Sequence, residues 1–441
     1  MKTIPIRFKK YLSSYHRPNA KIESLARFAF SVFTSQASPL SSERSFLFKF
    51  PPKQLLFYNS LGRCAYYTYN ALFILCARRY APGCNISIDM MEKPNISLQR
   101  LNMARTFHEL DSKDEGQVDL QQLFEDYAKH LQAYELVEDD SDWWLKCRSE
   151  FANEFVRHPD RSARIRDFRK GSHSTSAALL NDSARLLGKR SKRANMLLSL
   201  RYIMSYHELA RSVSTHTLLT NSESFIGNPK AINYRGIRIN ERTLRYSYYS
   251  DNINNNLPDI CSKRRVIADI GGGYGGLIRA LKHKLGSHTY VLCELPETLL
   301  FASYYLRCNF KGSSFKECTS VEDLESIYNS EHNYDFVLMT PGVFHRIKDD
   351  WIYLAINTTS IGEMTKETQQ QYIKSIESTS QHFYSVNRLG SRSDDKYNTI
   401  GFSDLDFMRG WSPLLIRYTR TYHYEVLGRK VSSNARKKAE Y

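Results

Sequence analysis

The sequence predicts an α/β fold with a mostly parallel sheet for residues 256–441, and three observations favour it. Short apolar runs alternate with helical segments over this part of the chain. The first run ends in a turn with five glycines in six residues, and the second run ends in an acid. Alternation of strands and helices is typical of parallel strands joined by crossover helices.

The expected elements can be placed in chain order. Strands are expected at 266–270, 290–293, 334–341, 351–357 and 382–389. Helices are expected at 277–285, 297–308 and 365–380. Residues 414–427 have alternating β character, so we expect them to end the domain as a terminal hairpin or an antiparallel edge strand.

Two further regions are expected before the sheet. Residues 96–255 are expected to be mostly helical, since apolar side chains recur at helical spacing between 183 and 213. Residues 223–253 hold a Gly-Asn-Pro turn and several tyrosines, and we interpret them as a lid or connector over the mouth of the sheet. We expect the helical region to cover the substrate and to set specificity. Residues 1–95 are basic and aromatic, and no role is assigned to them.

Composition and charge restrict the class of protein. With 41% hydrophobic and 24% charged residues, the 441-residue chain is expected to be globular and to form two or three domains. The formal net charge of +16 favours anionic partners: nucleic acid, anionic lipid, or a phosphorylated or acidic substrate. Much of the excess lies near the two ends of the chain, so we expect solvated basic ends and no stable nucleic-acid complex.

The cysteines and the most apolar segment exclude further classes. The eight cysteines are scattered without a CxxC pair, so neither a cysteine metal site nor a disulfide framework is expected. No spacing of His, Asp or Glu predicts a metal ion. Residues 55–76 are the most apolar stretch, but Asn59, Arg63 and Asn70 interrupt it, and a span needs about 20 mostly apolar residues. No signal peptide is visible, so we expect a cytoplasmic protein without a transmembrane segment.

The glycine turn fits two cofactor templates. Gly271-x-Gly273-x-x-Gly276 is the dinucleotide fingerprint, and Asp269-x-Gly271-x-Gly273-x-Gly275 is the pattern of S-adenosylmethionine-dependent methyltransferases. Asp269 favours the second template, because a carboxylate would repel a pyrophosphate but attract the amino group of a methionine moiety. The late position of the motif, after a large helical region, favours the same template. Glu294 suits both templates, since an acid at the end of the second strand can accept hydrogen bonds from ribose hydroxyls.

A family resemblance agrees with the second template. "ADIGGGYGGL" with "CELPETL" resembles the sugar O-methyltransferase family of the class I methyltransferase superfamily. Further matching segments keep their order in the chain: "FIGNPKAI", "LRYSYY", "AINTTSIGEM", "YIKSIEST" and "HFYSVNRL". The resemblance covers residues 140–430, and Glu294 stands where many relatives have Asp.

The resemblance implies a fold, a cofactor and an acceptor. The fold would be a Rossmann-like class I methyltransferase sheet of seven strands with the last one antiparallel, behind the helical N-terminal region. The cofactor would be S-adenosylmethionine, bound by Asp269, Gly271, Gly273, Gly275 and Glu294. The acceptor would be a hydroxyl of a sugar, a nucleotide sugar or a glycan.

The strand at 351–357 is expected to end near the reacting methyl group. Asn357 and Ser360 are therefore candidate acceptor-binding residues. Glu363 and His345 are candidate general bases for the acceptor proton. His382 begins a strand and is expected to be structural.

Three alternative functions stay open at this point. An NAD-dependent oxidoreductase would use the dinucleotide fingerprint. A nucleic-acid methyltransferase fits the net charge, but "NTTSIGEM" stands where an Asn-Pro-Pro-Tyr-type motif would be expected. A non-catalytic cofactor-binding relative is the third, although the intact glycine turn and both acids disfavour it.

Overall fold

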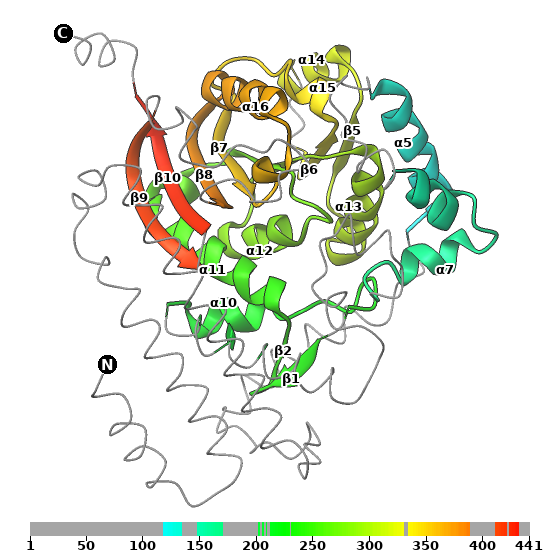
Figure 1. The fold of residues 1–441 in the computed structure, drawn as a ribbon, viewed down its shortest axis with the longest axis horizontal. Helices are drawn as coiled ribbons and strands as arrows, with labels where there is room; N and C mark the ends of the chain where they lie inside the picture. The colour runs from blue at the N-terminus through cyan, green and yellow to red at the C-terminus, as the bar shows by residue number, and fades with distance from the viewer. Residues whose placement is uncertain are drawn as a thin grey trace, which may run out of the picture.

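The structure is a computed structural model of the chain, shown in Figure 1. It describes residues 118–134, 148–170, 212–229, 231–329, 334–388, 411–420 and 423–431, with single positions at 202, 205, 206 and 209. Only the backbone is described at residues 363 and 388, at 417–420 and at 423–424. The basic and aromatic region expected at 1–95 lies outside the described residues.

A single large sheet forms the centre of the described fold. Its strands are β3 (Val266–Ile270), β4 (Thr289–Cys293), β5 (Phe315–Cys318), β6 (Phe336–Met339), β7 (Ile352–Thr358), β8 (Ser380–Arg388), β9 (Trp411–Arg420) and β10 (His423–Lys430). They lie in the order β5-β6-β4-β3-β7-β8-β10-β9. Strands β3 to β8 pair in parallel, whereas β10 runs antiparallel to both β8 and β9. The expected parallel sheet with an antiparallel last strand is confirmed.

The sheet has eight strands where seven were expected. The additional strand is β5, whose sequence is Phe-Lys-Glu-Cys and which pairs only with β6 at the edge. Three of its four side chains are partly exposed. A strand at the edge of a sheet needs no continuous run of apolar residues. The four-residue sequence of β5 therefore resembles that of a loop.

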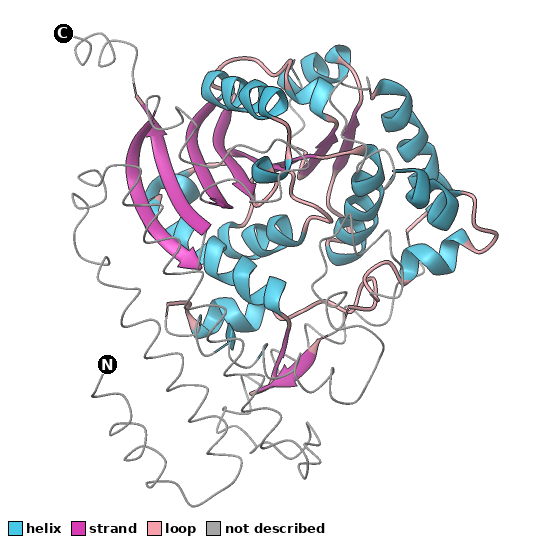
Figure 2. Cartoon of the chain, viewed as in Figure 1, coloured by secondary structure: helices cyan, strands magenta, loops and turns pink. Residues whose placement is uncertain are grey.

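Helices cover both faces of the sheet, as Figures 1 and 2 show. One face carries α11 (Glu241–Asn256), α12 (Gly276–Leu285) and α13 (Pro296–Asn309); the other carries α14 (Val321–Asn329), α15 (Pro341–Phe344) and α16 (Lys366–Thr379). Successive side chains of a strand point to opposite faces. Ile267 accordingly packs in the hydrophobic core with α11–α13, and Ala268 packs in the second core with α14–α16.

The helix α11 joins the first half of the chain to the last strand. It packs beside α12. Its Tyr248 hydroxyl and Asn252 amide donate to the buried carboxylate of Glu425 on β10, at 3.1 and 2.9 Å. The Tyr384 hydroxyl on β8 donates to the same carboxylate at 2.6 Å. Helix α11, which ends at the expected boundary near residue 256, is therefore one of the helices packed on the sheet.

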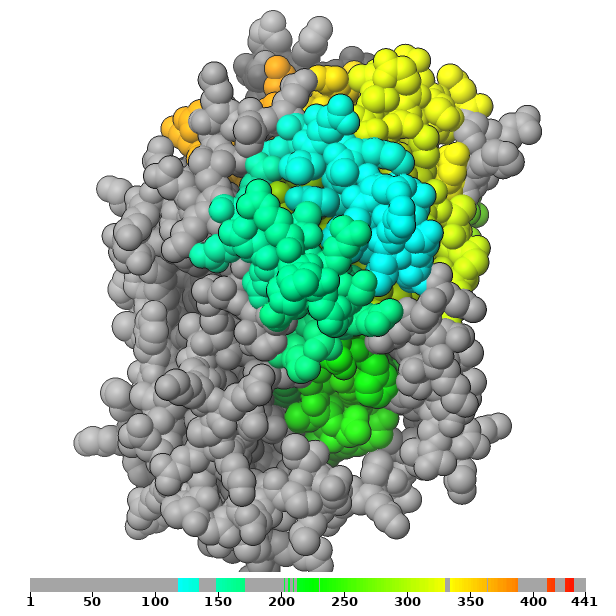
Figure 3. All heavy atoms as spheres, turned by 90° about the vertical axis from the view of Figure 1, so that its right-hand side faces the viewer, coloured from blue at the N-terminus to red at the C-terminus, as the bar shows by residue number. Residues whose placement is uncertain are grey.

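The other described elements of this half of the chain precede β3. They are α5 (Leu120–Ala133), a π-helix (Ala152–Val156), α7 (Arg161–Arg166), α10 (Thr215–Thr220), β1 (Ile232–Tyr234), β2 (Ile237–Ile239) and, after α11, a 3₁₀ helix (Pro258–Ser262). Figure 3 shows α5 and residues 148–170 side by side on one face of the molecule. Phe151, Phe155 and Phe168 pack their rings around Phe301 of α13, with centroid distances of 5.4, 5.0 and 4.9 Å. Within the described ranges, no helix combines the length and apolarity that a membrane crossing requires.

Candidate cofactor-binding site

The glycine turn lies where the strand order of the sheet reverses. From β3 the chain proceeds to β4 on one side, and later to β7 on the other side. The carboxyl ends of β3, β4 and β7 therefore meet at one edge. Ligands of doubly wound sheets bind in the crevice at such a point. Residues 271–276 follow β3, Glu294 follows β4, and Asn357 lies near the end of β7.

Three glycines of the turn have a left-handed backbone, but only one of them faces open space. The φ angles of Gly271, Gly273 and Gly275 are +67°, +60° and +82°. A Cβ atom on Gly271 would lie 2.0 Å from Ser360 Oγ, and one on Gly275 would lie 3.1 Å from Leu306. A Cβ on Gly273 would meet no atom within 4 Å. Of the three, Gly273 is thus the position where a side chain would meet no protein atom and the turn leaves open space.

The other two glycines are needed for packing as well. A Cβ on Gly272 would lie 2.4 Å from Asp269 Oδ2, and one on Gly276 would lie 2.5 Å from the Tyr246 ring. Glycine allows this close approach because it has no side chain. The five glycines therefore divide into four packing positions and one open position.

Glu294 lies directly beside the open position. Its Oε1 atom accepts a hydrogen bond from the Gly273 N–H at 2.7 Å, and Oε2 accepts one from the Leu295 N–H at 3.0 Å. The residue is half-buried. Glu294 therefore holds its carboxylate, an acceptor of hydrogen bonds, next to the backbone of Gly273.

Asp269 is the second acid of the site, and the protein gives it no donor. The side chain is completely buried, and neither carboxyl oxygen has a hydrogen-bond partner. Burial, followed by the negative charge of Glu294, raises the pKa of Asp269 to about 8. A buried carboxyl without a donor is unfavourable. A ligand that brings an ammonium group to this edge would supply the missing donor and charge.

Asn357 and Ser360 hold the backbone just before the glycine turn. The Asn357 Nδ2 atom donates to the Ile270 carbonyl at 2.7 Å, and the Ser360 hydroxyl donates to the same carbonyl at 3.2 Å. The Asn357 Oδ1 atom accepts from the Asn387 amide at 2.9 Å and from the Ile361 N–H at 3.2 Å. The two residues expected to bind the acceptor therefore contact the turn itself.

The two candidate bases follow different strands of the sheet, Glu363 after β7 and His345 after β6 and α15. Glu363 is the last residue of a 3₁₀ helix (Ile361–Glu363) that follows β7, and its side chain lies outside the described part of the structure. His345 follows α15, and its Nδ1 atom lies 2.7 Å from the Ser375 hydroxyl of α16. Burial lowers the pKa of His345 to about 4, so its imidazole is neutral at pH 7 but is a weaker base than an exposed imidazole. His382 lies in β8, with Nδ1 3.2 Å from the Tyr353 carbonyl oxygen.

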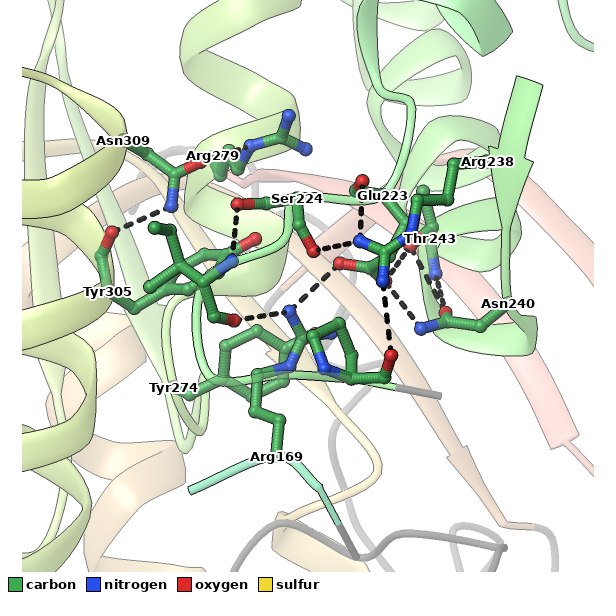
Figure 4. Close-up of polar contacts among 12 residues, drawn as sticks. Arg169, Glu223, Ser224, Arg238, Asn240, Thr243, Tyr274, Arg279, Tyr305 and Asn309 are labelled. Carbon is green, nitrogen blue, oxygen red and sulfur yellow. Dashed lines mark hydrogen bonds and ion pairs between the residues drawn. The ribbon is translucent and has the colours of Figure 1, made fainter. Parts of the chain in front are cut away.

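A buried polar cluster outside the sequence motifs touches the turn, as Figure 4 shows. Arg169 donates from Nη1 to Glu223 Oε1 at 2.9 Å and from Nη2 to the Tyr274 hydroxyl at 3.0 Å. Burial alone would lower the pKa of Arg169, but the negative charge of Glu223 raises it, so the guanidinium stays charged. Tyr274 could have been noticed as the one side chain within the glycine run. Arg169 and Glu223 carry no such local signal.

The described sheet and glycine turn are those of a Rossmann-like α/β protein. Proteins of this class bind nucleotide-containing cofactors at this edge of the sheet.

No protein-family model matches the chain, and no curated protein matches it in sequence. Among solved structures, the chain is similar to a SAM-dependent methyltransferase from Aquifex aeolicus, with a TM-score of 0.27, 9% identity, and coverage of 42% of this chain and 97% of that chain.

Two further structures carry bound ligands in their descriptions. One is the 1,6-didemethyltoxoflavin-N1-methyltransferase of Burkholderia thailandensis with S-adenosylhomocysteine, at TM-score 0.28, 12% identity, and coverage of 42% and 78% of the two chains. The other is a geranyl diphosphate methyltransferase with SAM, at TM-score 0.28, 9% identity, and coverage of 43% and 88%.

Proposed function

We propose that the protein is an S-adenosylmethionine-dependent O-methyltransferase that acts on a hydroxyl of a sugar, a nucleotide sugar or a glycan. The observation that carries the cofactor part is the open face of Gly273 between two acids. Glu294 would accept the ribose hydroxyls, and Asp269 would pair with the methionine ammonium group. A dinucleotide would instead bring a pyrophosphate, which would add negative charge beside Glu294 and would offer the buried carboxyl of Asp269 no donor.

The residues at the ends of β3 and β7 prepare the site for this cofactor. Gly271 and Gly275 let the turn pack tightly, and Asn357 with Ser360 fixes the carbonyl of Ile270. The bound cofactor supplies an electrophilic methyl group. The acceptor oxygen would take up this methyl group as the carbon–sulfur bond breaks, and the hydroxyl proton would pass to a base. Glu363 and His345 are the candidates for that base, and alignment of the acceptor supplies much of the rate.

The acceptor class rests on the resemblance of the separated sequence segments to sugar O-methyltransferases. The Asn-Thr-x-Ser-x-x-Glu-Met segment, 357–364, begins with the last two residues of β7, the strand that pairs with β3 before the glycine turn. The helical region before the sheet would cover the acceptor and select it. The net charge of +16 makes an anionic acceptor, such as a nucleotide sugar, the preferred first substrate to test. We place the reaction in the cytoplasm as part of the same proposal.

The test has a binding step and a transfer step. Calorimetry with the full chain should show binding of S-adenosylmethionine and none of NADH. A labelled-methyl assay should then be made with free sugars, nucleotide sugars, glycans and RNA. Transfer to a sugar hydroxyl is the expected result. Transfer to RNA alone would identify a nucleic-acid methyltransferase, and NADH binding without S-adenosylmethionine binding would identify a dinucleotide enzyme.

A further inference from the structure

Tyr274 is the only side chain within the glycine turn, and it is held from several sides. It directly follows Gly273, and its ring is 2% exposed. The ring packs edge-on against Tyr305 of α13 at 4.9 Å between centroids. The guanidinium carbon of Arg169 lies 4.3 Å above the ring centroid, and Arg169 also donates to the Tyr274 hydroxyl. The contacts of Tyr274 with Tyr305 and Arg169 therefore anchor the glycine turn to the surrounding structure.

Arg169 is itself fixed by the segments before the sheet. Its backbone N–H donates to the Gly227 carbonyl at 2.7 Å, and its Nη1 atom contacts both Glu223 and the Ile226 carbonyl. Gly227 has a φ of +81°, and a Cβ there would lie 2.5 Å from the Phe168 ring. The 167–169 turn and the 223–228 loop are thus packed against each other without spare space.

Glu223 connects this cluster to the start of α11. Its Oε2 atom accepts hydrogen bonds from the Asn240 amide and from the Thr243 hydroxyl, as Figure 4 shows. Burial alone would raise the pKa of Glu223, but Arg169 keeps it below its usual value. A buried ion pair is compatible with stability only when further hydrogen bonds satisfy both partners. Here both partners have further hydrogen bonds, and Arg169 Nη2 donates to the Tyr274 hydroxyl.

We propose that Arg169 and Glu223 are positioning residues that set the conformation of the glycine turn through the Tyr274 hydroxyl. The proposal deepens the cofactor assignment and rests on it. A run of glycines has many accessible backbone conformations, and only those that present the Gly273 face beside Glu294 can bind the cofactor. Anchoring Tyr274 reduces this freedom before binding. The segments 148–170 and 221–240 thereby complete the cofactor site without contacting the cofactor.

The test variant is Tyr274→Phe, which keeps the ring and leaves the Arg169–Glu223 ion pair intact. The matched control is Tyr384→Phe, which also removes a buried hydroxyl bonded to a buried charged residue, but on β8. The affinity for S-adenosylmethionine should fall about five- to tenfold in Tyr274→Phe, the lower range of coupling between sites. It should stay at the wild-type value in Tyr384→Phe. Thermal midpoints of both variants show whether a general loss of stability explains the effect.

A second measurement needs no cofactor. Hydrogen exchange of the amides of residues 271–276 in the ligand-free protein should be faster in Tyr274→Phe than in Tyr384→Phe at equal stability. Unchanged exchange, or equal losses of affinity in both variants, would overturn the positioning role. The two variants could show the expected difference in exchange while the wild-type protein binds no S-adenosylmethionine. That result would overturn the proposed cofactor and leave the anchoring of the turn supported. Arg169→Lys, which keeps the charge, gives a further check if Tyr274→Phe does not fold.

Discussion

The carboxylate of Glu294 on the segment after β4 reaches across to the N–H of Gly273 after β3, with an N–O distance of 2.7 Å. The hydrogen bond joins the two motifs that the sequence displays separately. It also places a carboxylate next to Gly273, the one glycine of the turn that has an open face. The first two predictions concern these two residues.

Replacement of Glu294 should weaken the binding of the cofactor. Glu294→Ala removes a charged acceptor, and hydrogen bonds to charged groups contribute about 1.5–3 kcal/mol each. We expect the affinity for S-adenosylmethionine, measured by calorimetry, to fall by about tenfold or more. Glu294→Asp is the matched control, because it keeps the charge with a shorter reach, and it should retain part of the affinity. Equal affinities in wild type and Glu294→Ala would show that the ribose lies elsewhere.

A side chain at Gly273 should block the ligand approach. Gly273→Val places atoms in the open space and imposes a strained backbone at φ +60°. Gly312→Ala is the control for a glycine with positive φ and open surroundings, since Gly312 has φ +76° and lies after α13. We expect Gly273→Val to abolish detectable S-adenosylmethionine binding while the protein remains folded by circular dichroism. Wild-type affinity in this variant would rule out the cofactor assignment.

The buried carboxyl of Asp269 should make the stability of the ligand-free protein depend on pH. Its pKa is raised from 3.8 to about 8 in the fold. Between these values the folded state holds a proton that the unfolded state has released, so stability falls as pH rises from about 4 to about 8. The slope for one proton is about 1.4 kcal/mol per pH unit. Asp269→Asn should remove this contribution, as measured by denaturant unfolding of both proteins between pH 5 and pH 8. An identical slope in the two proteins would contradict the prediction.

Two variants distinguish the candidate bases. Glu363→Gln keeps the size of the side chain and removes the proton acceptor, whereas His345→Ala removes the rival imidazole. Loss of the base should lower the turnover number about 10²–10⁴-fold, with the affinity for S-adenosylmethionine unchanged. The loss of only a few fold in a variant would indicate that this residue positions the acceptor. Wild-type turnover in both variants would exclude both residues.

Strands and turns that depend on a short run of residues could be predicted from the sequence, because neighbouring residues carry the pattern. β3 was expected at its observed bounds, and the glycine turn was expected to lead into the helix now seen as α12. Strand β5 was missed because its mixture of polar and apolar residues lies at an edge. The two acids and the glycines of the turn follow from motif spacing. The division of the glycines into packing positions and one open position does not, since it depends on Ser360, Leu306 and other distant residues.

The polar cluster at the turn could not be predicted for a similar reason. Arg169 lies 54 residues before Glu223 and 105 residues before Tyr274. No sequence motif connects residues that are 54 or 105 positions apart. Asn357 was predicted as a candidate site residue because it ends the right strand, but its hydrogen bond to the Ile270 carbonyl depends on the pairing of β7 with β3.

The contact between α11 and β10 sets an order of events during synthesis. Tyr248 and Asn252 find their acceptor, Glu425, 177 and 173 residues further along the chain. On a ribosome, α11 and the first strands emerge well before this partner exists. We therefore expect the nascent chain to hold an incomplete core until its last strand leaves the exit tunnel, and to depend on chaperones during that interval. A premature stop before residue 425 would leave a chain that cannot complete this core.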